Sequence, residues 1–145
     1  MDKALEIVLV EDNADDEELI LHALHKYHLA NRIHVVRDGA EALDLLLPTD
    51  NDAVHKSELK LILLDLKLPK IDGLEVLRHL KNDPRTKTIP VVVLTSSASE
   101  QDIIKSYQLG VNGYVTKPID FAQFSEAVYQ LGLYWLVVNQ KPHYQ

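Results

Sequence analysis

The sequence predicts an α/β fold in which a parallel sheet lies between two layers of helices. Short apolar runs such as Ile7–Val10 and Leu61–Leu64 are typical of strands that are buried on both faces. Segments with apolar residues at helical spacing alternate strictly with these runs. This alternation predicts parallel strands joined by helices that cross over both faces of the sheet.

Five strands are expected at about residues 6–10, 32–36, 60–64, 90–94 and 113–116. Five helices are expected at about 15–27, 39–47, 73–82, 100–109 and 120–138. Apolar residues of the first helix share one face: Leu19, Ile20, Ala23, Leu24 and Tyr27. The second and third helices are expected to end before Pro48 and Pro84, because proline cannot continue a helix. Gly110 is typical of the residue that closes a helix.

The 145 residues predict a single domain, 1–145, with a core at about 5–138 and a C-terminal tail at 139–145. The absence of cysteine excludes disulfides, thiolate metal sites and thiol nucleophiles. A formal net charge of -7 disfavours direct binding to nucleic acid or to an anionic membrane. Because the start lacks the features of a signal peptide and no apolar stretch reaches the length of a membrane span, we expect a cytoplasmic protein.

The long, mostly polar linker at 48–59 is expected to be a surface excursion. The last expected helix ends near the end of the chain, so we expect no room for a separate output domain.

Chemically active residues follow the expected strands at the point where each strand ends. They are Glu11, Asp12, Asp65, Thr95 and Lys117. In parallel α/β sheets, ligands bind beyond the carboxyl ends of the strands. Carboxylates that lie close together raise one another's pKa unless a cation neutralises them, and Mg²⁺ suits a site of carboxylates and phosphate oxygens.

This set of residues predicts phosphoryl chemistry. Asp65 can attack phosphorus as a nucleophile, while Mg²⁺ and Lys117 offset the charge on the phosphoryl oxygens and Thr95 donates a hydrogen bond to one of them. The alternative is that these residues are polar strand ends that contact water. Lys117-Pro118 allows two interpretations, a plain turn or a cis peptide bond that aims the lysine inward.

Other motifs fail. The sequence has no G-x-G-x-x-G and no G-K-[ST] motif, and the run from Asp12 lacks the glycine and the glutamate of an EF-hand at Glu17 and Ala23. The acidic residues 15–18 are interpreted as a solvated helix start. The remaining candidates are interpreted as surface histidines (His22, His25, His28) and as loop or cap serines (Ser96, Ser97, Ser99).

The segments VLVEDN, LILLDLKLPKIDG, VVVLTSS and GYVTKP, in this order, resemble the receiver domain of two-component response regulators over residues 5–138. The resemblance implies a flavodoxin-like, doubly wound (βα)5 fold with strand order 2-1-3-4-5. It implies that Asp65 accepts phosphate from a sensor histidine kinase. It also implies that Asp12 ligates Mg²⁺, that Glu11 acts through water, and that the backbone carbonyl of Lys67 is a further ligand.

By the same resemblance, Thr95 and Lys117 would bind the phosphoryl oxygens and Tyr114 would be the switch aromatic residue. The V-x-R-D-G-A-E-A-L segment and the tail L-G-L-Y-W-L resemble the small regulators associated with bacterial and cyanobacterial phytochromes, so a phytochrome is a candidate partner. One departure is Lys67, which stands where smaller polar residues are frequent.

The expected function is a stand-alone phosphoacceptor switch, with Mg²⁺-dependent self-phosphorylation and autodephosphorylation but no other enzymatic activity. Two alternatives are kept. One is an aspartyl-nucleophile phosphohydrolase, which would want a second acid at the position of Lys67. The other is a phosphorylation-independent interaction module of the same fold.

The last helix also predicts a homodimer. It carries an apolar stripe of Phe121, Phe124, Val128, Leu131, Tyr134, Trp135 and Val138. Leu133, Leu136 and Val137 would add apolar surface off this stripe, and a two-fold dimer is the commonest way to cover such a patch.

Overall fold

The fold is built on a sheet of five parallel strands in the order β2-β1-β3-β4-β5. The strands are β1 (Ile7–Val10), β2 (Ile33–Val36), β3 (Leu61–Leu64), β4 (Val91–Thr95) and β5 (Gly113–Thr116). The structure is a computed structural model that describes residues 6–30, 32–47 and 59–141. The flavodoxin-like fold, the strand order and the approximate positions of the strands expected from the sequence are confirmed.

The register of the strands brings their carboxyl ends to one edge of the sheet. Val10, the last residue of β1, pairs with Val36 on one side and with Leu64 on the other. Leu64 in turn pairs with Val93, so β4 continues for two residues beyond it and ends at Thr95. Residues that directly follow β1 and β3 therefore emerge side by side.

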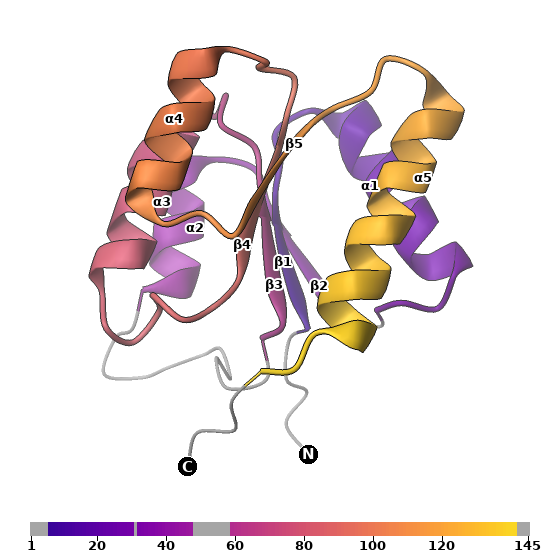
Figure 1. Cartoon of the computed structure of the whole chain (residues 1–145), viewed down its shortest axis with the longest axis horizontal. Coiled ribbons are helices and arrows are strands. Elements are labelled where there is room, and N and C mark those ends of the chain that lie inside the picture. Colours follow the sequence, from indigo (N-terminus) through magenta and orange to yellow (C-terminus); the bar gives the residue numbers. More distant parts are fainter. Residues whose placement is uncertain (1–5, 31, 48–58, 142–145) are drawn as a thin grey trace.

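The sheet is covered on both faces. Helices α1 (Ala14–Lys26) and α5 (Phe121–Gly132) lie side by side on one face, and α2 (Gly39–Leu46), α3 (Gly73–Asn82) and α4 (Glu100–Leu109) lie on the other (Figure 1). None of the helices in the described part of the chain combines the length and apolarity needed to cross a membrane.

Each of these helices begins at a residue whose side chain accepts a hydrogen bond from a backbone N–H of the first turn. The capping residues are Asn13, Asp38, Asp72, Ser99 and Asp120. Such a cap is worth about 1 kcal/mol, and it fixes the angle at which the helix leaves the site edge. At the other end of α4, Gly110 has a φ of 101°, a left-handed conformation that confirms its expected closing role.

Alternate residues along the strands pack into two separate hydrophobic cores, one on each face of the sheet. Val8, Val10, Ile62 and Leu64 pack toward the face of α2, α3 and α4. Ile7, Leu9, Leu61 and Leu63 pack toward the face of α1 and α5. Each fully buried side chain of this size contributes about 1.5–3 kcal/mol to folding, so the two cores hold the central strands rigidly. The site residues lie at the ends of these rigid strands.

The last helix differs from the single α-helix expected at 120–138. It is α-helical only to Gly132 and then continues as a π-helical segment, Leu133–Val138. A Cβ at residue 132 would lie 2.6 Å from Leu29 Cδ1, so glycine lets the helix approach the end of α1 closely. The wider turn carries the Asn139 N–H to the carbonyl of Tyr134, five residues back, at 2.6 Å.

The apolar surface near the end of the last helix differs from the one that the sequence predicts. Leu136, expected among the surface residues, is buried with 6% exposure, because it packs into the same core as Phe124 and Val128 of the preceding turns. Leu133 and Val137 are exposed as expected, and so are Phe121, Tyr134 and Val138 of the stripe. The expected surface excursion at 48–59 lies outside the described residues except for Leu59, which is buried.

Candidate functional site

Three carboxylates meet at the edge of the sheet, as the sequence predicts. Glu11 and Asp12 follow β1, Asp65 follows β3, and one oxygen from each lies within 4.8 Å of the others. Glu11 and Asp65 are buried, with 1% and 6% exposure, while Asp12 is exposed. The Asp65 N–H donates to the Val10 carbonyl at 3.0 Å, which extends the β1–β3 pairing into the site.

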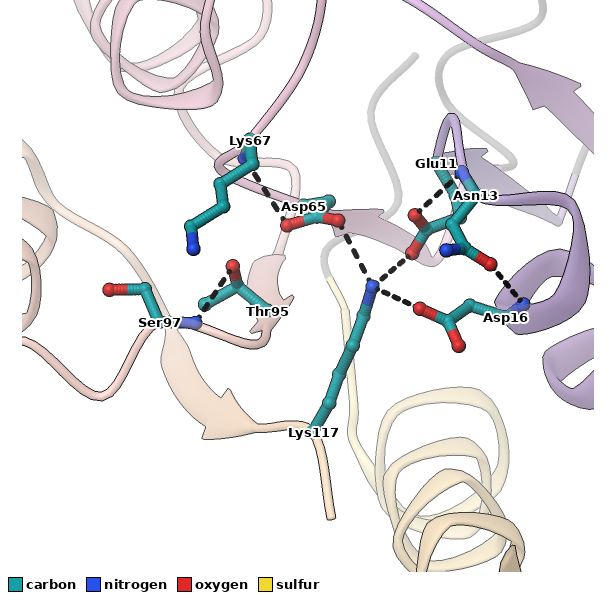
Figure 2. A network of polar contacts seen from close by, with 8 residues as sticks. All are labelled: Glu11, Asn13, Asp16, Asp65, Lys67, Thr95, Ser97 and Lys117. Atoms are coloured by element: carbon teal, nitrogen blue, oxygen red, sulfur yellow. Dashed lines mark hydrogen bonds and ion pairs between the residues drawn. The ribbon is translucent and has the colours of Figure 1, made fainter. Parts of the chain in front are cut away.

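Lys117, which follows β5, reaches into this cluster. Its Nζ lies 2.7 Å from Glu11 Oε1 and 3.0 Å from Asp65 Oδ2 (Figure 2). The Lys117–Pro118 peptide bond is trans, so the interpretation that a cis bond aims the lysine inward is wrong. The lysine is aimed instead by strand pairing, because its N–H donates to the Thr95 carbonyl at 2.7 Å.

The lysine has a third carboxylate partner that the sequence did not indicate. Asp16 in the first turn of α1 places Oδ2 at 2.7 Å from Lys117 Nζ. The interpretation of residues 15–18 as a solvated helix start is therefore wrong for Asp16. The contact joins residues 101 apart in the chain, so no local spacing could have revealed it.

Burial and ion pairing set the charges of this group. Burial raises the pKa of Glu11 to about 7, against the opposing effect of Lys117. Burial also acts to raise the pKa of Asp65, but hydrogen bonding by Thr95 and the nearby Lys117 outweigh it and hold that pKa below its usual value. Burial acts to lower the pKa of Lys117, but its hydrogen bonds to Asp16 and Glu11 raise it overall. The Asp65 carboxylate and the ammonium are therefore both charged at neutral pH.

On the other side of Asp65, a chain of contacts leads from Thr95 to β5. The Thr95 hydroxyl accepts a hydrogen bond from the Ser97 N–H at 3.4 Å. The Ser97 carbonyl in turn accepts one from the Tyr114 hydroxyl at 2.8 Å, and the Ser97 hydroxyl donates to Asp102 at 2.6 Å. Ser97 is a loop residue and Ser99 a cap residue, as expected, but Ser97 also links the site to Tyr114.

The loop after Asp65 is fitted closely around the carboxylate. The Lys67 N–H donates to Asp65 Oδ1 at 3.3 Å, and the Lys67 side chain extends toward Thr95 and Ser97, on the side away from Lys117 (Figure 2). A Cβ at Gly73 would lie 2.3 Å from the Asp65 carbonyl oxygen, so α3 can begin this close to the site only with glycine. Asp12, Lys67 and Asp102 are among the residues that line an open groove of about 420 Å³ near Asp65.

The donor set fits a divalent cation. The oxygens of Glu11, Asp12 and Asp65 are hard ligands, which magnesium prefers to nitrogen or sulfur. Their mutual separations, within 4.8 Å, allow direct ligation by some and ligation through water by others, as Mg²⁺ usually shows. Among the described residues, this is the only group of three or more such side chains; the histidines of α1 are exposed, as expected.

Comparison with known proteins agrees with this geometry. The response regulator receiver domain family matches residues 7–129. The Probable methanogenesis regulatory protein FilR2 of Methanothrix harundinacea is 41% identical over 136 residues, which is 94% of this chain and 86% of that protein. Response regulator Rcp1 of Synechocystis is 40% identical over 130 residues, which is 90% of this chain and 88% of that protein.

Solved structures show the same relationship. The phosphorylated cyanobacterial phytochrome response regulator RcpA has a TM-score of 0.87 and 44% identity, covering 97% of this chain and 99% of its own. The Mn²⁺-bound form of Rcp1 has a TM-score of 0.86 and 38% identity, covering 95% and 99%. The strand order, the strand-end acids and the matched residues define the class of protein. This chain belongs to the response regulator receiver domain family, and it is similar to single-domain members of that family.

Proposed function

We propose that this protein is a phosphoacceptor switch that receives a phosphoryl group on Asp65 from a sensor histidine kinase. The observation that carries the proposal is the setting of the Asp65 carboxylate. It lies beside Glu11 and Asp12, with Lys117 Nζ 3.0 Å from one of its oxygens. Transfer of a phosphoryl group to a carboxylate needs positive charge near the phosphoryl oxygens, and a cation and an ammonium beside the same carboxylate would provide it.

In the proposed reaction, an Asp65 carboxylate oxygen attacks the phosphorus of a phosphohistidine. The new O–P bond forms as the N–P bond breaks, and the imidazole leaves with a proton from solvent. Lys117 and the Thr95 hydroxyl hold the phosphoryl oxygens. The donor side chain would enter through the open groove near Asp65, which has Asp12 and Lys67 in its wall.

Asp12, Asp65 and the Lys67 carbonyl would hold the cation, with Glu11 acting through water. When bound, Mg²⁺ supplies positive charge that offsets the oxygens of the attacking and transferring groups. Mn²⁺ in the structure of Rcp1 supports a divalent ion at this edge, and the all-oxygen donor set favours Mg²⁺.

The output of the switch would be the Thr95–Ser97–Tyr114 connection. A phosphoryl oxygen that draws the Thr95 hydroxyl would move Ser97, to which the hydroxyl is bonded, and would thereby change the contact with Tyr114. This is a local electrostatic event that biases a two-state element. Helix α4, strand β5 and helix α5 would form the surface to which partners bind.

The partner would be a histidine kinase of the phytochrome type, since RcpA is a cyanobacterial phytochrome response regulator and resembles this chain over nearly its whole length. The net charge of -7 supports the further proposal that the protein contacts neither nucleic acid nor an anionic membrane directly. We also propose that it is cytoplasmic. A single domain over 1–145 suits a switch of this kind.

We also propose a homodimer built around the end of α5. Leu133, Tyr134, Val137 and Val138 present 37%, 49%, 60% and 55% exposure in the single chain. A second copy related by a two-fold axis would bury these side chains against one another. Leu136 is not part of this surface, because it packs into the core.

Incubation with acetyl phosphate and Mg²⁺ tests the function. The wild type should form one base-labile, hydroxylamine-sensitive phosphoryl adduct, and Asp65→Asn should form none. Equal labelling of the two proteins would refute the acceptor. Rapid turnover of a free phosphate ester by the wild type would instead favour the phosphohydrolase alternative.

A further inference from the structure

Asp16 contacts the lysine of the site without belonging to the group of acids that can hold the cation. Its Oδ2 lies 2.7 Å from Lys117 Nζ, as close as Glu11 Oε1 and closer than Asp65 Oδ2. The acids whose oxygens lie near enough for a common ion are Glu11, Asp12 and Asp65, and Asp16 is not among them. Asp16 is therefore linked to the site through its contact with the lysine.

The position of Asp16 is well defined. It is the third residue of α1, and its N–H donates to the capping side chain of Asn13 at 2.9 Å. This cap fixes the first turn of the helix, and with it the direction in which the carboxylate can point. The side chain is 24% exposed, so the ion pair is partly shielded from water.

A lysine ammonium has three protons to donate, and Lys117 directs them at Glu11, Asp65 and Asp16. A bound cation would interact with oxygens of Asp65 directly and of Glu11 through water, and phosphorylation would modify Asp65. Asp16 takes part in neither event, so its bond to the ammonium is compatible with both. Asp16 thus offers the ammonium an acceptor that it can keep throughout the cycle.

Resting on the function proposed above, we propose that Asp16 is a positioning residue that holds Lys117 Nζ and keeps part of its charge away from the metal ligands. Without Asp16, the ammonium would give its hydrogen bonds to Glu11 and Asp65 alone. A divalent cation would then have to displace a stronger ion pair before it could bind. Asp16 therefore favours cation binding and leaves the lysine ready for the incoming phosphoryl oxygens.

A double-mutant cycle on Mg²⁺ affinity tests this role, with the shift of the thermal midpoint on Mg²⁺ titration as the readout and no phosphoryl donor present. Asp16→Asn should weaken Mg²⁺ binding by about fivefold to tenfold, the size of a typical coupling between charged neighbours. In a Lys117→Met background, the same substitution should change the affinity by less than about twofold.

Two further variants complete the design. Asp15→Asn removes the same charge one residue earlier, at an exposed position, and should leave the affinity unchanged within about twofold. Asp16→Glu keeps a carboxylate within reach of the ammonium and should restore most of the affinity, which also guards against a folding defect in Asp16→Asn.

Equal weakening with and without Lys117 would overturn the proposal, because Asp16 would then act on the ion by its charge alone. Equal effects of Asp15→Asn and Asp16→Asn would overturn it as well. Neither result touches the phosphoacceptor function, which depends on the labelling of Asp65 and would survive the failure of this inference.

Discussion

The Tyr114 hydroxyl donates a hydrogen bond to the Ser97 carbonyl at 2.8 Å, and the Ser97 N–H in turn donates to the Thr95 hydroxyl. Tyr114 is thus already turned toward the loop between β4 and α4, and it packs against the core beneath α4. Thr95 is in this way connected through Ser97 to strand β5, which carries Tyr114.

Tyr114→Phe should separate phosphorylation from its consequences. The hydroxyl is the only part removed, so stability should fall by about 0.5–1.5 kcal/mol and labelling of Asp65 should persist. Phosphorylation of the wild type should slow or speed amide exchange in both the 96–99 loop and β5. The variant should lose the response in β5. Exchange changes confined to the surroundings of Asp65 in the wild type would contradict the coupling.

Mg²⁺ should stabilise the folded protein, because an ion that binds only the native state raises the free energy of unfolding by mass action. At one hundred times the dissociation constant, the gain is about 2.7 kcal/mol. Asp12→Ala should abolish the gain, because it removes an exposed ligand without disturbing the core. A thermal midpoint that millimolar Mg²⁺ leaves unmoved in the wild type would count against the metal site.

Lys67 should lengthen the lifetime of the phosphorylated state. Its side chain extends beside Asp65 toward Thr95, where it can screen the phosphorus from water or pair with a phosphoryl oxygen. Lys67→Asn should speed autodephosphorylation by about threefold or more, equal to roughly 0.7 kcal/mol on the barrier. The decay of labelled protein after removal of the donor measures the rate, and an unchanged or slower decay would show that the side chain has no such role.

Lys81 should make stability depend on pH above neutrality. Its Nζ donates to the carbonyls of Lys87 and Ile89 and to the Asn112 side chain at 2.9–3.0 Å, with no carboxylate among these acceptors. Burial lowers the pKa of Lys81 to about 8 from the ordinary 10.5. Between these values the unfolded chain binds the proton more than the folded chain does, so stability rises with pH.

The matched measurement is the free energy of unfolding of the wild type and of Lys81→Met, from denaturant titrations between pH 7 and pH 10.5. Subtracting the variant removes the contribution of the other titrating groups. The wild type should gain stability relative to the variant as the pH rises from about 8. A difference that stays constant across this range would contradict the lowered pKa.

Val137→Asp should weaken self-association. The residue is 60% exposed on the π-helical segment, so the folded monomer should tolerate the charge, whereas a two-fold interface would place two carboxylates close together. Light scattering at micromolar concentration should show a dimer for the wild type and a monomer for the variant, with Asp65 still labelled. Ile104→Asp, which adds the same charge on α4, is the control and should remain dimeric. A monomeric wild type, with and without phosphorylation, would reject the dimer.

The five strands and the chemical site were predictable because both depend on local features of the chain. Runs such as Leu61–Leu64 are apolar throughout, and only a strand covered on both faces buries every residue of such a run. Once the strands are parallel, their ends share one edge, so the residues after β1 and β3 had to be neighbours. The positions of Thr95 and Lys117 at this edge were predictable for the same reason, because each lies at the end of a parallel strand.

The sequence by itself therefore determined the layers, the strand order implied by its motifs, and the identity of the acids, the hydroxyl and the lysine. Only the tertiary structure decided which carboxylates share Lys117, because Asp16 looks like any other acid in a first helical turn until α1 is set against the end of β5. It also decided that Leu136 is buried, because this side chain packs into a core shared with Phe124 and Leu29, which come from distant parts of the chain. Contacts between distant segments depend on how helices pack, and helix packing is a property of the whole core that no local pattern records.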